Sequence, residues 1–339
     1  MSVSNVQGNA MKLPRRQFLH LAAGAAALPA ASRFAWAQAY PSRPVTMIVP
    51  YLAGGPADGL ARPLAERMSA ALGQAVMAEN VPGQSGAIGV ARAVKAAADG
   101  YTLSFGHNGS HVVNGAVFSL PYDLRTDFEP IALLPSNPLM ISARKDFPAA
   151  NLKGLIAWLR ANPGKAATGN VGPASGTNIN AIYFQNATDT RLQFVPHKSV
   201  QTAIKALVAG QLDLLFDQAS HSLPYLRAGT IKAYAVTSKT RTPSAPDIPT
   251  TDEGGLPGFH SSTWYGLWVP KGTPKDVIAR LNRAAVEAMA DPVVSKRLIE
   301  QGLDMPPSDQ QTPEALGAFH RSEIEKWWPI IKAAGIKPG

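Results

Sequence analysis

One order of elements recurs along the chain: a short apolar run, a glycine-rich turn and a helical segment. The turns are "LAGGPAD" from Leu52, "VPGQSGAIG" from Val81 and "VGPASGTN" from Val171. Units of this spacing need right-handed crossovers, which place successive strands parallel to one another in a sheet. The sequence therefore predicts an α/β fold.

The order of elements occurs twice, which predicts two βα domains. The expected strands are 45–50, 76–80, 138–143, 166–170, 192–195, 212–216, 232–236 and 264–270, with a further strand that follows a turn within 99–106. The expected helices are 57–72, 152–161, 178–186, 199–209, 274–290, 292–301 and 312–334, with a further helix that follows the turn at 81–89 and ends at 97. We expect domain 1 to comprise residues 40–138 and 263–339, and domain 2 to comprise 139–262. Two strands would then cross between the domains, with a ligand cleft between the two lobes.

The first 37 residues are typical of a cleaved export signal. Lys12, Arg15 and Arg16 precede an apolar, alanine-rich centre, and "AWA" ending at Ala37 is a small-x-small cleavage site. The centre is too short to span a bilayer stably. "RRQFL" from Arg15 predicts a twin-arginine signal, so we expect a periplasmic protein cleaved near Ala37. An amphipathic helix that stays in the fold is the alternative.

Charge and composition exclude several classes of function. Four positive charges of the formal net charge of +9 lie in the signal, which leaves +5 in the mature chain. Because no basic block is interleaved with aromatic residues, nucleic acid is not expected as a partner. The chain has no cysteine, which rules out disulfides and thiolate chemistry. No nucleotide P-loop, dinucleotide fingerprint or HExxH sequence occurs, and no cofactor is expected.

Histidines offer a weak argument for catalysis or metal binding. His107 and His111 are four residues apart, but no acidic third ligand is near, and His107 is expected in a cleft loop after the third strand. An exported hydrolase would need His197 or His221, both expected on loops after strands, together with Ser175 or Ser220. The nucleophile elbow GxSxG is absent, so this alternative is kept but not favoured.

The glycine-rich turns favour an anion site. Backbone N–H groups at a helix start lack partners and lie at the positive end of the helix dipole. Three such starts facing one cleft could hold a carboxylate without lysine or arginine. For a single turn, an ordinary glycine-capped connection is the simpler interpretation, and Asp58 can simply cap the first helix.

Nearly the whole mature chain resembles the Bug-type periplasmic substrate-binding proteins of tripartite tricarboxylate transporters. The motifs that carry the resemblance occur in order and include "YPSRPVTMIVPYLAGGPADGLAR", "VPHKSVQTAIKALVAGQLDLLFD" and "WYGLWVPKGTPKDVIARLN". The resemblance implies a two-lobed, type II periplasmic-binding-protein fold that closes on a small carboxylated molecule. It also implies a receptor that delivers its ligand to transporter membrane subunits, performs no chemistry and is monomeric.

The resemblance also assigns candidate ligand-binding residues. In the family, the first two loops hold one carboxylate through backbone groups and water, at positions matching Ala53, Gly54, Gly55, Asp58, Gly83, Gln84, Ser85 and Gly86. The rest of the ligand meets the second domain at positions matching Ala174, Ser175, Thr177, Asn178, His197, Lys198, Asp217 and Gln218.

Three departures from the family pattern bear on which ligand is bound. Leu52-Ala53 replaces the usual Pro-Pro, His197-Lys198-Ser199 replaces Tyr-Lys-Gly, and Asn178 replaces a frequent histidine. His197 is expected either to contact a second carboxylate or ring nitrogen, or only to pack under the hinge. A sensor that feeds a signalling system remains an alternative to the transport receptor.

Overall fold

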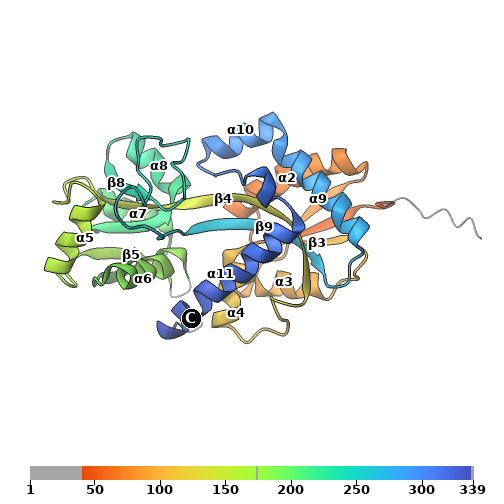
Figure 1. The fold of residues 1–339 in the computed structure, drawn as a ribbon, viewed down its shortest axis with the longest axis horizontal. Helices are drawn as coiled ribbons and strands as arrows, with labels where there is room; N and C mark the ends of the chain where they lie inside the picture. Colours follow the sequence, from red (N-terminus) through yellow and green to blue (C-terminus); the bar gives the residue numbers. More distant parts are fainter. Residues whose placement is uncertain (1–39, 173–174, 337–339) are drawn as a thin grey trace, which may run out of the picture. The chain divides into compact units, whose positions relative to one another are not determined.

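A computed structural model describes residues 40–172 and 175–336. The predicted export signal and Ala174 lie outside these ranges. The strands are β1 (Val45–Val49), β2 (Val76–Asn80), β3 (Thr102–His107), β4 (Phe128–Arg144), β5 (Ala167–Asn170), β6 (Gln193–Pro196), β7 (Leu214–Gln218), β8 (Ile231–Val236) and β9 (Ser262–Pro270) (Figure 1).

The helices follow the strands much as the sequence predicts. They are α2 (Pro56–Leu72), α3 (Ala87–Val94), α4 (Asn114–Val117), α5 (Leu152–Ala161), α6 (Gly176–Thr188), α7 (Val200–Val208), α8 (Ala219–Arg227), α9 (Lys275–Ala290), α10 (Pro292–Glu300) and α11 (Pro313–Ala333). Short turns precede α3 (Gln84–Gly86), α4 (a π-helical turn, Gly109–Val113) and α11 (Ser308–Gln310). In the described part of the chain, no helix is long and apolar enough to span a membrane.

Each lobe is built on parallel strands, as predicted, but both sheets are mixed. In the first lobe, β1 pairs in parallel with β2 and with β3, and β9 joins β3 in the antiparallel direction. In the second lobe, β5 pairs in parallel with β6 and β7, while β7 and β8 both run antiparallel to β4. The strands that run against the parallel direction are β9 in the first lobe and β4 in the second, which are also the two strands that pass between the lobes.

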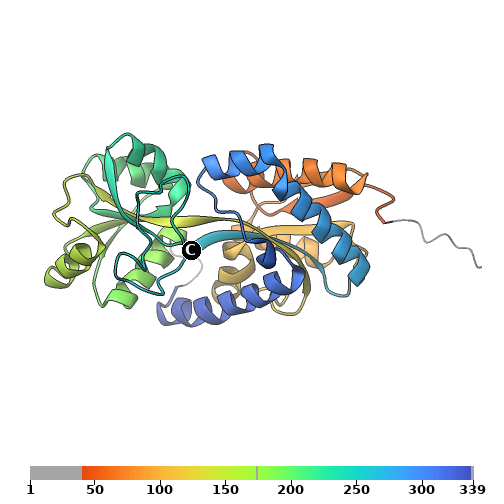
Figure 2. The same cartoon turned by 45° about the horizontal axis from the view of Figure 1, so that its top comes forward.

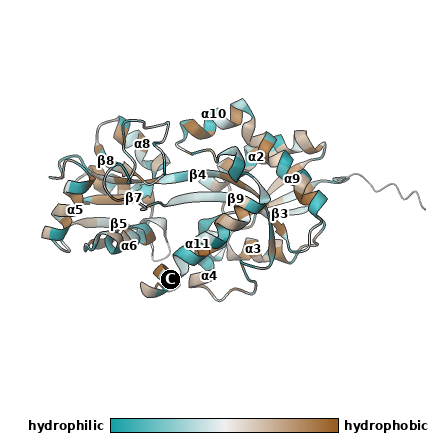
Figure 3. Cartoon of the chain, viewed as in Figure 1, coloured by the Kyte–Doolittle hydropathy of each residue, from teal (hydrophilic) through white to brown (hydrophobic). Residues whose placement is uncertain are grey.

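Strands β4 and β9 connect the lobes. The first part of β4 pairs with β9, from Phe128 opposite Pro270 to Pro138 opposite Ser262. The last part of β4 pairs with β7 and β8 in the second lobe. Figure 2 shows the two strands running side by side between the two groups of helices. Their central stretches are pale in Figure 3, because polar residues and prolines occupy the crossing.

The hydrophobic cores lie on either side of this crossing. Ile141, Phe184 and Phe216 belong to the core cluster of the second lobe. Trp264, Trp268 and Trp327 belong to a separate cluster in the first lobe. Burying three indole rings removes a large apolar area from water, so the first lobe has a rigid base for the strands that end at the cleft.

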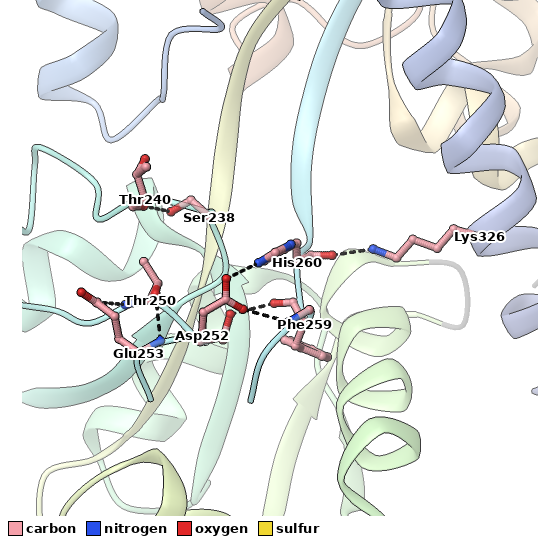
Figure 4. A network of polar contacts seen from close by, with 10 residues as sticks. Ser238, Thr240, Thr250, Asp252, Glu253, Phe259, His260 and Lys326 are labelled. Carbon is pink, nitrogen blue, oxygen red and sulfur yellow. Dashed lines mark hydrogen bonds and ion pairs between the residues drawn. The ribbon is translucent and has the colours of Figure 1, made fainter. Parts of the chain in front are cut away.

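Helix α11 also contacts the second lobe. Lys326 Nζ donates to the backbone oxygen of His260 at 2.5 Å, as Figure 4 shows. The same ammonium group lies 4.9 Å from the ring centroid of Tyr183 on α6. His260 is held in turn by Asp252, whose carboxylate lies 2.9 Å from His260 Nε2. We call Lys326, Tyr183 and His260 the α11 clasp.

Candidate functional site

Three adjoining cavities lie between the lobes. The loop cavity has a volume of about 380 Å³ and lies against both first-lobe glycine loops. The hinge cavity, about 320 Å³, shares Tyr51, Ser85, His107 and Gln218 with it. The flank cavity, about 500 Å³, shares Gly55, Pro56 and Tyr265 with the loop cavity.

The loop cavity gathers many of the residues expected from the sequence. They are Gly55, Gly83, Ser85, Gly86, His107 and Gln218. Ser175 lines the hinge cavity and Gly54 lines the flank cavity. Gln84 instead lines an outer groove of about 710 Å³ beside α3, to which no second-lobe residue contributes among the described positions.

Asp58 supports the first glycine loop through a hydrogen bond to its backbone. Its Oδ2 accepts hydrogen bonds from the Gly54 backbone N–H at 2.9 Å and from Arg62 Nε at 2.8 Å. Its Oδ1 accepts from Asn80 Nδ2 at 2.9 Å. The Gly54 N–H is therefore already used, and the donors left at the start of α2 are those of the first helical turn. Ala57 in that turn lines the loop cavity.

The ionised form of Asp58 is the stable one. Burial of this carboxyl opposes ionisation, but hydrogen bonds from Arg62, Gly54 and Asn80 outweigh burial and lower its pKa below the ordinary value. The negative charge holds the loop in place and is not directed at a ligand.

The second glycine loop has an unusual backbone. Four consecutive residues, Gly83 to Gly86, have positive φ angles of 130°, 47°, 52° and 95°. Two of them, Gln84 and Ser85, are not glycine, and L side chains adopt this region at a cost of about 1–3 kcal/mol. Gly86 N–H bonds Gly83 O at 2.9 Å, and Asn114 Nδ2 bonds Ser85 O at 3.0 Å. Strain held in this way is typical of functional loops.

His107 presents a neutral donor to the cleft. It is the last residue of β3, whereas the sequence predicted a loop position. Its Nδ1 accepts the Gly109 backbone N–H at 2.8 Å, so the ring proton belongs on Nε2. The ring stacks on Tyr51 with centroids 4.5 Å apart and an interplanar angle of 8°. Burial lowers the pKa of His107 to about 4, so the ring is uncharged at neutral pH.

Gln218 joins both crossing strands at the hinge. Its Nε2 donates to Thr263 Oγ1 on β9 at 3.0 Å, and its Oε1 accepts from Asn137 Nδ2 on β4 at 3.1 Å. Asn137 also bonds Ser220 Oγ at 2.6 Å. Because Gln218 lines two of the cavities, a ligand that contacts it would also act on the hinge.

The third glycine turn places Ser175 at the start of α6. Ser175 Oγ accepts the Asn178 backbone N–H at 3.3 Å and donates to Gly172 O at 2.6 Å. This cap begins the helix two residues earlier than the sequence predicted. Thr177 and Asn178 are buried in the first turn. Of these three candidates, Ser175 is the one that lines the hinge cavity.

The remaining second-lobe candidates lie away from the cavity walls. Lys198 is exposed, and His197 Nε2 is buried without a hydrogen-bond partner among the described residues. Asp217 is buried and bonded to His221, which lies in helix α8 and not in the loop that the sequence suggested. Neither His197, Lys198 nor Asp217 lines the loop, hinge or flank cavity, nor does Ala53 in the first lobe.

Two tyrosines at the site were not singled out from the sequence. Tyr51 and Tyr265 both line the loop cavity and contact the ring of His107. Tyr51 follows the first strand directly, which is a signal that could have identified it. Tyr265 is on β9, far from any glycine turn, and only the sheet pairing brings it opposite His107.

A two-lobed α/β chain with helix starts directed into an interlobe cleft defines a solute-binding protein. The model of the family described as "Tripartite tricarboxylate transporter family receptor" matches residues 60–336. The chain belongs to this receptor family. It is also 31% identical to the protein BugT of Bordetella pertussis over 303 residues, which are 89% of this chain and 92% of BugT.

Two solved structures show the same architecture with ligands. MatC of Rhodopseudomonas palustris with bound malate is 35% identical, with a TM-score of 0.70 over 86% of this chain and 100% of MatC. A second R. palustris protein, solved with adipate, is 31% identical, with a TM-score of 0.72 over 88% of this chain and 99% of that protein.

Proposed function

We propose that this chain is an exported receptor that binds a small dicarboxylate and delivers it to the membrane subunits of a tripartite tricarboxylate-type transporter. One observation carries the proposal. The starts of α2 and α3, His107 and Gln218 line one cavity of about 380 Å³. Among the described residues, no lysine or arginine lines that cavity, so neutral donors would hold the anion.

Relatives support the class of ligand. The family is that of tricarboxylate transporter receptors, and two similar proteins hold malate and adipate. Both ligands carry two carboxylates on a short aliphatic chain, so a dicarboxylate of four to six carbons is the favoured ligand for this protein. Of the candidate residues from the sequence, the proposed contacts are Gly55, Gly83, Ser85, Gly86, His107, Ser175 and Gln218.

We further propose the boundaries and the location given by the sequence. Residues 40–138 with 263–339 form one domain and 139–262 the other, with twin-arginine export and cleavage near Ala37. The mature protein would act as a periplasmic monomer. Mass spectrometry of the protein released from the periplasm checks the cleavage position, since an intact leader would contradict it.

The receptor would perform no catalysis. Ser220 Oγ bonds Asn137, and Ser175 Oγ donates to a backbone oxygen, so neither hydroxyl is paired with the histidine that a hydrolase would need. A sensor for a signalling system would use the same binding site and differ only in its membrane partner. Pull-down of detergent-solubilised membranes with ligand-bound protein separates these two roles.

A thermal-shift screen tests the binding function. Malate, succinate, adipate, citrate and benzoate would be added to the mature protein. A true ligand at 100 times its dissociation constant adds about 2.7 kcal/mol of stability. Stabilisation by one or more of the acids, recovered unchanged afterwards, is expected. No stabilisation by any acid, or conversion of one to product, would overturn the proposal.

A further inference from the structure

A histidine of the second lobe faces the first glycine loop. His221 lines the flank cavity together with Gly54 and Gly55 at the start of α2. Its Nδ1 lies 3.1 Å from Oδ2 of Asp217, a residue that is 4% exposed in β7. Because an ionised carboxylate only accepts, Nδ1 carries the proton of this bond. The other ring nitrogen, Nε2, is then the one that can meet a ligand.

The net charge around the flank cavity depends on whether His221 is protonated. Its other ionisable lining residues are Arg227 on α8, Glu300 on α10 and Tyr265 on β9. Burial raises the pKa of Tyr265, so this phenol stays neutral. Asp217 and Glu300 supply two negative charges and Arg227 one positive charge. A protonated His221 brings the four charged groups to zero, and a neutral His221 leaves a net negative charge.

Other charged groups lie near this cavity. Asp304 follows the lining residue Leu303, and burial raises its pKa to about 6, so it adds a negative charge beside the cavity above that pH. Glu300 also meets Lys296, but at 4.0 Å and on the exposed face of α10. Arg227 Nη2 donates to Ser244 O at 3.0 Å. Behind the α2 start, Asp58 is already neutralised by Arg62. The hydrogen bond that His221 donates to Asp217 raises the pKa of His221, against the opposing effect of burial, so the protonated form extends towards neutral pH.

We propose that His221 determines the preference for ligands with two carboxylates. In its protonated form it neutralises Asp217 and donates from Nε2 to the second carboxylate, while the first lies at the glycine loops. The shared lining of the loop and flank cavities by Gly55, Pro56 and Tyr265 gives one ligand access to both. This inference rests on the proposed function and deepens it by naming a specificity-determining residue.

The competing interpretation is that His221 only caps the buried Asp217. The two interpretations differ in what happens to matched pairs of ligands. Succinate and butyrate have the same chain length, as do adipate and hexanoate, and each pair differs by one carboxylate. A structural role would change affinity for both members equally, whereas a specificity role changes the dicarboxylate alone.

The test is isothermal titration of the mature protein with these four acids. His221→Gln keeps a donor for Asp217 but cannot carry charge. His260→Gln is the matched control, because His260 forms a similar pair with Asp252 at 2.9 Å and lines none of the three cavities. We expect the dicarboxylate preference to fall about tenfold or more in His221→Gln, the range of a charged hydrogen bond, and to persist in His260→Gln.

The pH profile of the wild type is a second measurement, which stays informative if His221→Gln folds poorly. These acids are fully ionised above about pH 6.5, and His221, with its pKa raised above the ordinary value of 6.5, loses its proton in the range above that pH. We expect dicarboxylate affinity to fall across this range while monocarboxylate affinity stays level. An unchanged preference in a folded His221→Gln, or a flat wild-type profile, would overturn the inference alone. Failure of all four acids to bind would overturn the proposed function itself.

Discussion

At the scale of single residues, the site is held by groups that a ligand does not touch. Asp58 fixes the first loop by accepting three hydrogen bonds, and Asn114 supports the strained second loop through Ser85. The donors offered to the ligand are then backbone N–H groups with little freedom to move. Such preorganisation lowers the entropy lost on binding, which is why the supporting residues matter as much as the contacts.

The brace at Asp58 gives a first prediction. Asp58→Ala removes the acceptor of the Gly54 N–H and one of the hydrogen bonds of Asn80, and is expected to cost about 1–3 kcal/mol of unfolding free energy. It should also weaken ligand binding, because the loop loses its fixed position. Asp146→Ala is the control, since Asp146 forms an ion pair with Arg144 but its side chain is 79% exposed. Urea denaturation that finds equal stability in both variants would contradict the brace.

His107 gives a prediction about pH. Its folded-state pKa of about 4 lies below the ordinary value of 6.5, so the unfolded chain binds the proton more readily. Stability from this group is complete above about pH 6.5 and is lost as the pH falls towards about 4, by at most about 1.4 kcal/mol per pH unit. The His107→Gln variant should show a shallower decline over that window in thermal melts. Identical slopes would show that His107 does not carry the effect.

At the scale of elements, the two crossing strands and α11 connect the lobes. Asn137 on β4 and Thr263 on β9 are bonded to Gln218, so the end of β7 is tied to both strands. The α11 clasp adds a third connection. Closure of the cleft on a ligand would therefore bend β4 and β9 near these residues and shift α11 against the second lobe.

The α11 clasp predicts unequal roles for two lysines of one helix. Burial lowers the pKa of Lys326, whose ammonium group bonds His260 O and lies over the rings of Tyr183 and Trp327. Lys326→Ala should cost about 1–2 kcal/mol in urea denaturation. Lys332→Ala, near only Trp328 at 5.6 Å, should have a much smaller effect. Equal losses of unfolding free energy in the two variants would mean that the α11 clasp adds no stability of its own.

Much of the architecture at this scale could be predicted, and the failures have physical causes. Apolar periodicity located most helices and strands, and the glycine turns located the helix starts at the cleft. The length of β4 could not be predicted, because Pro130, Pro135 and Pro138 argue against a strand. The structure accommodates Pro130 and Pro135 where pairing with β9 shifts register, and Pro138 at the last pair, opposite Ser262. His221 was expected in a loop because a polar helix start after a strand has the same composition as a loop.

The site was predicted less completely than the fold. Glycines signal left-handed backbone, but nothing in Gln84 or Ser85 does, so the run of positive φ angles was not foreseen. Residues such as Tyr265 reach the site only through strand pairing. The residues that the family resemblance assigned to the second lobe, such as His197 and Asp217, lie behind the cavity walls in this structure. A ligand-induced closure that brings His197 forward would show as altered preference among acids in His197→Ala.

At the scale of the whole molecule, the proposed function requires that ligand binding be coupled to closure of the two lobes. A ligand favours the closed state only through contacts made in that state, from glycine loops on one lobe to Ser175, Gln218 and His221 on the other. Small-angle scattering should therefore report a smaller radius of gyration when a saturating dicarboxylate is present. An unchanged radius with full occupancy would separate binding from closure and weaken the receptor role.

The most direct test of the central claim is isothermal titration of wild-type protein and Gly86→Val with malate and adipate. Gly86 has φ of +95°, and a Cβ there would lie 3.2 Å from Ser110 Cβ and 3.3 Å from Pro50 Cβ. Gly164→Val is the control, with φ of +73° and no atom near its Cβ. The account predicts one saturable site in the wild type and in Gly164→Val, weakened at least about tenfold in Gly86→Val. Binding in Gly86→Val equal to wild type, or no binding in the wild type, would contradict it.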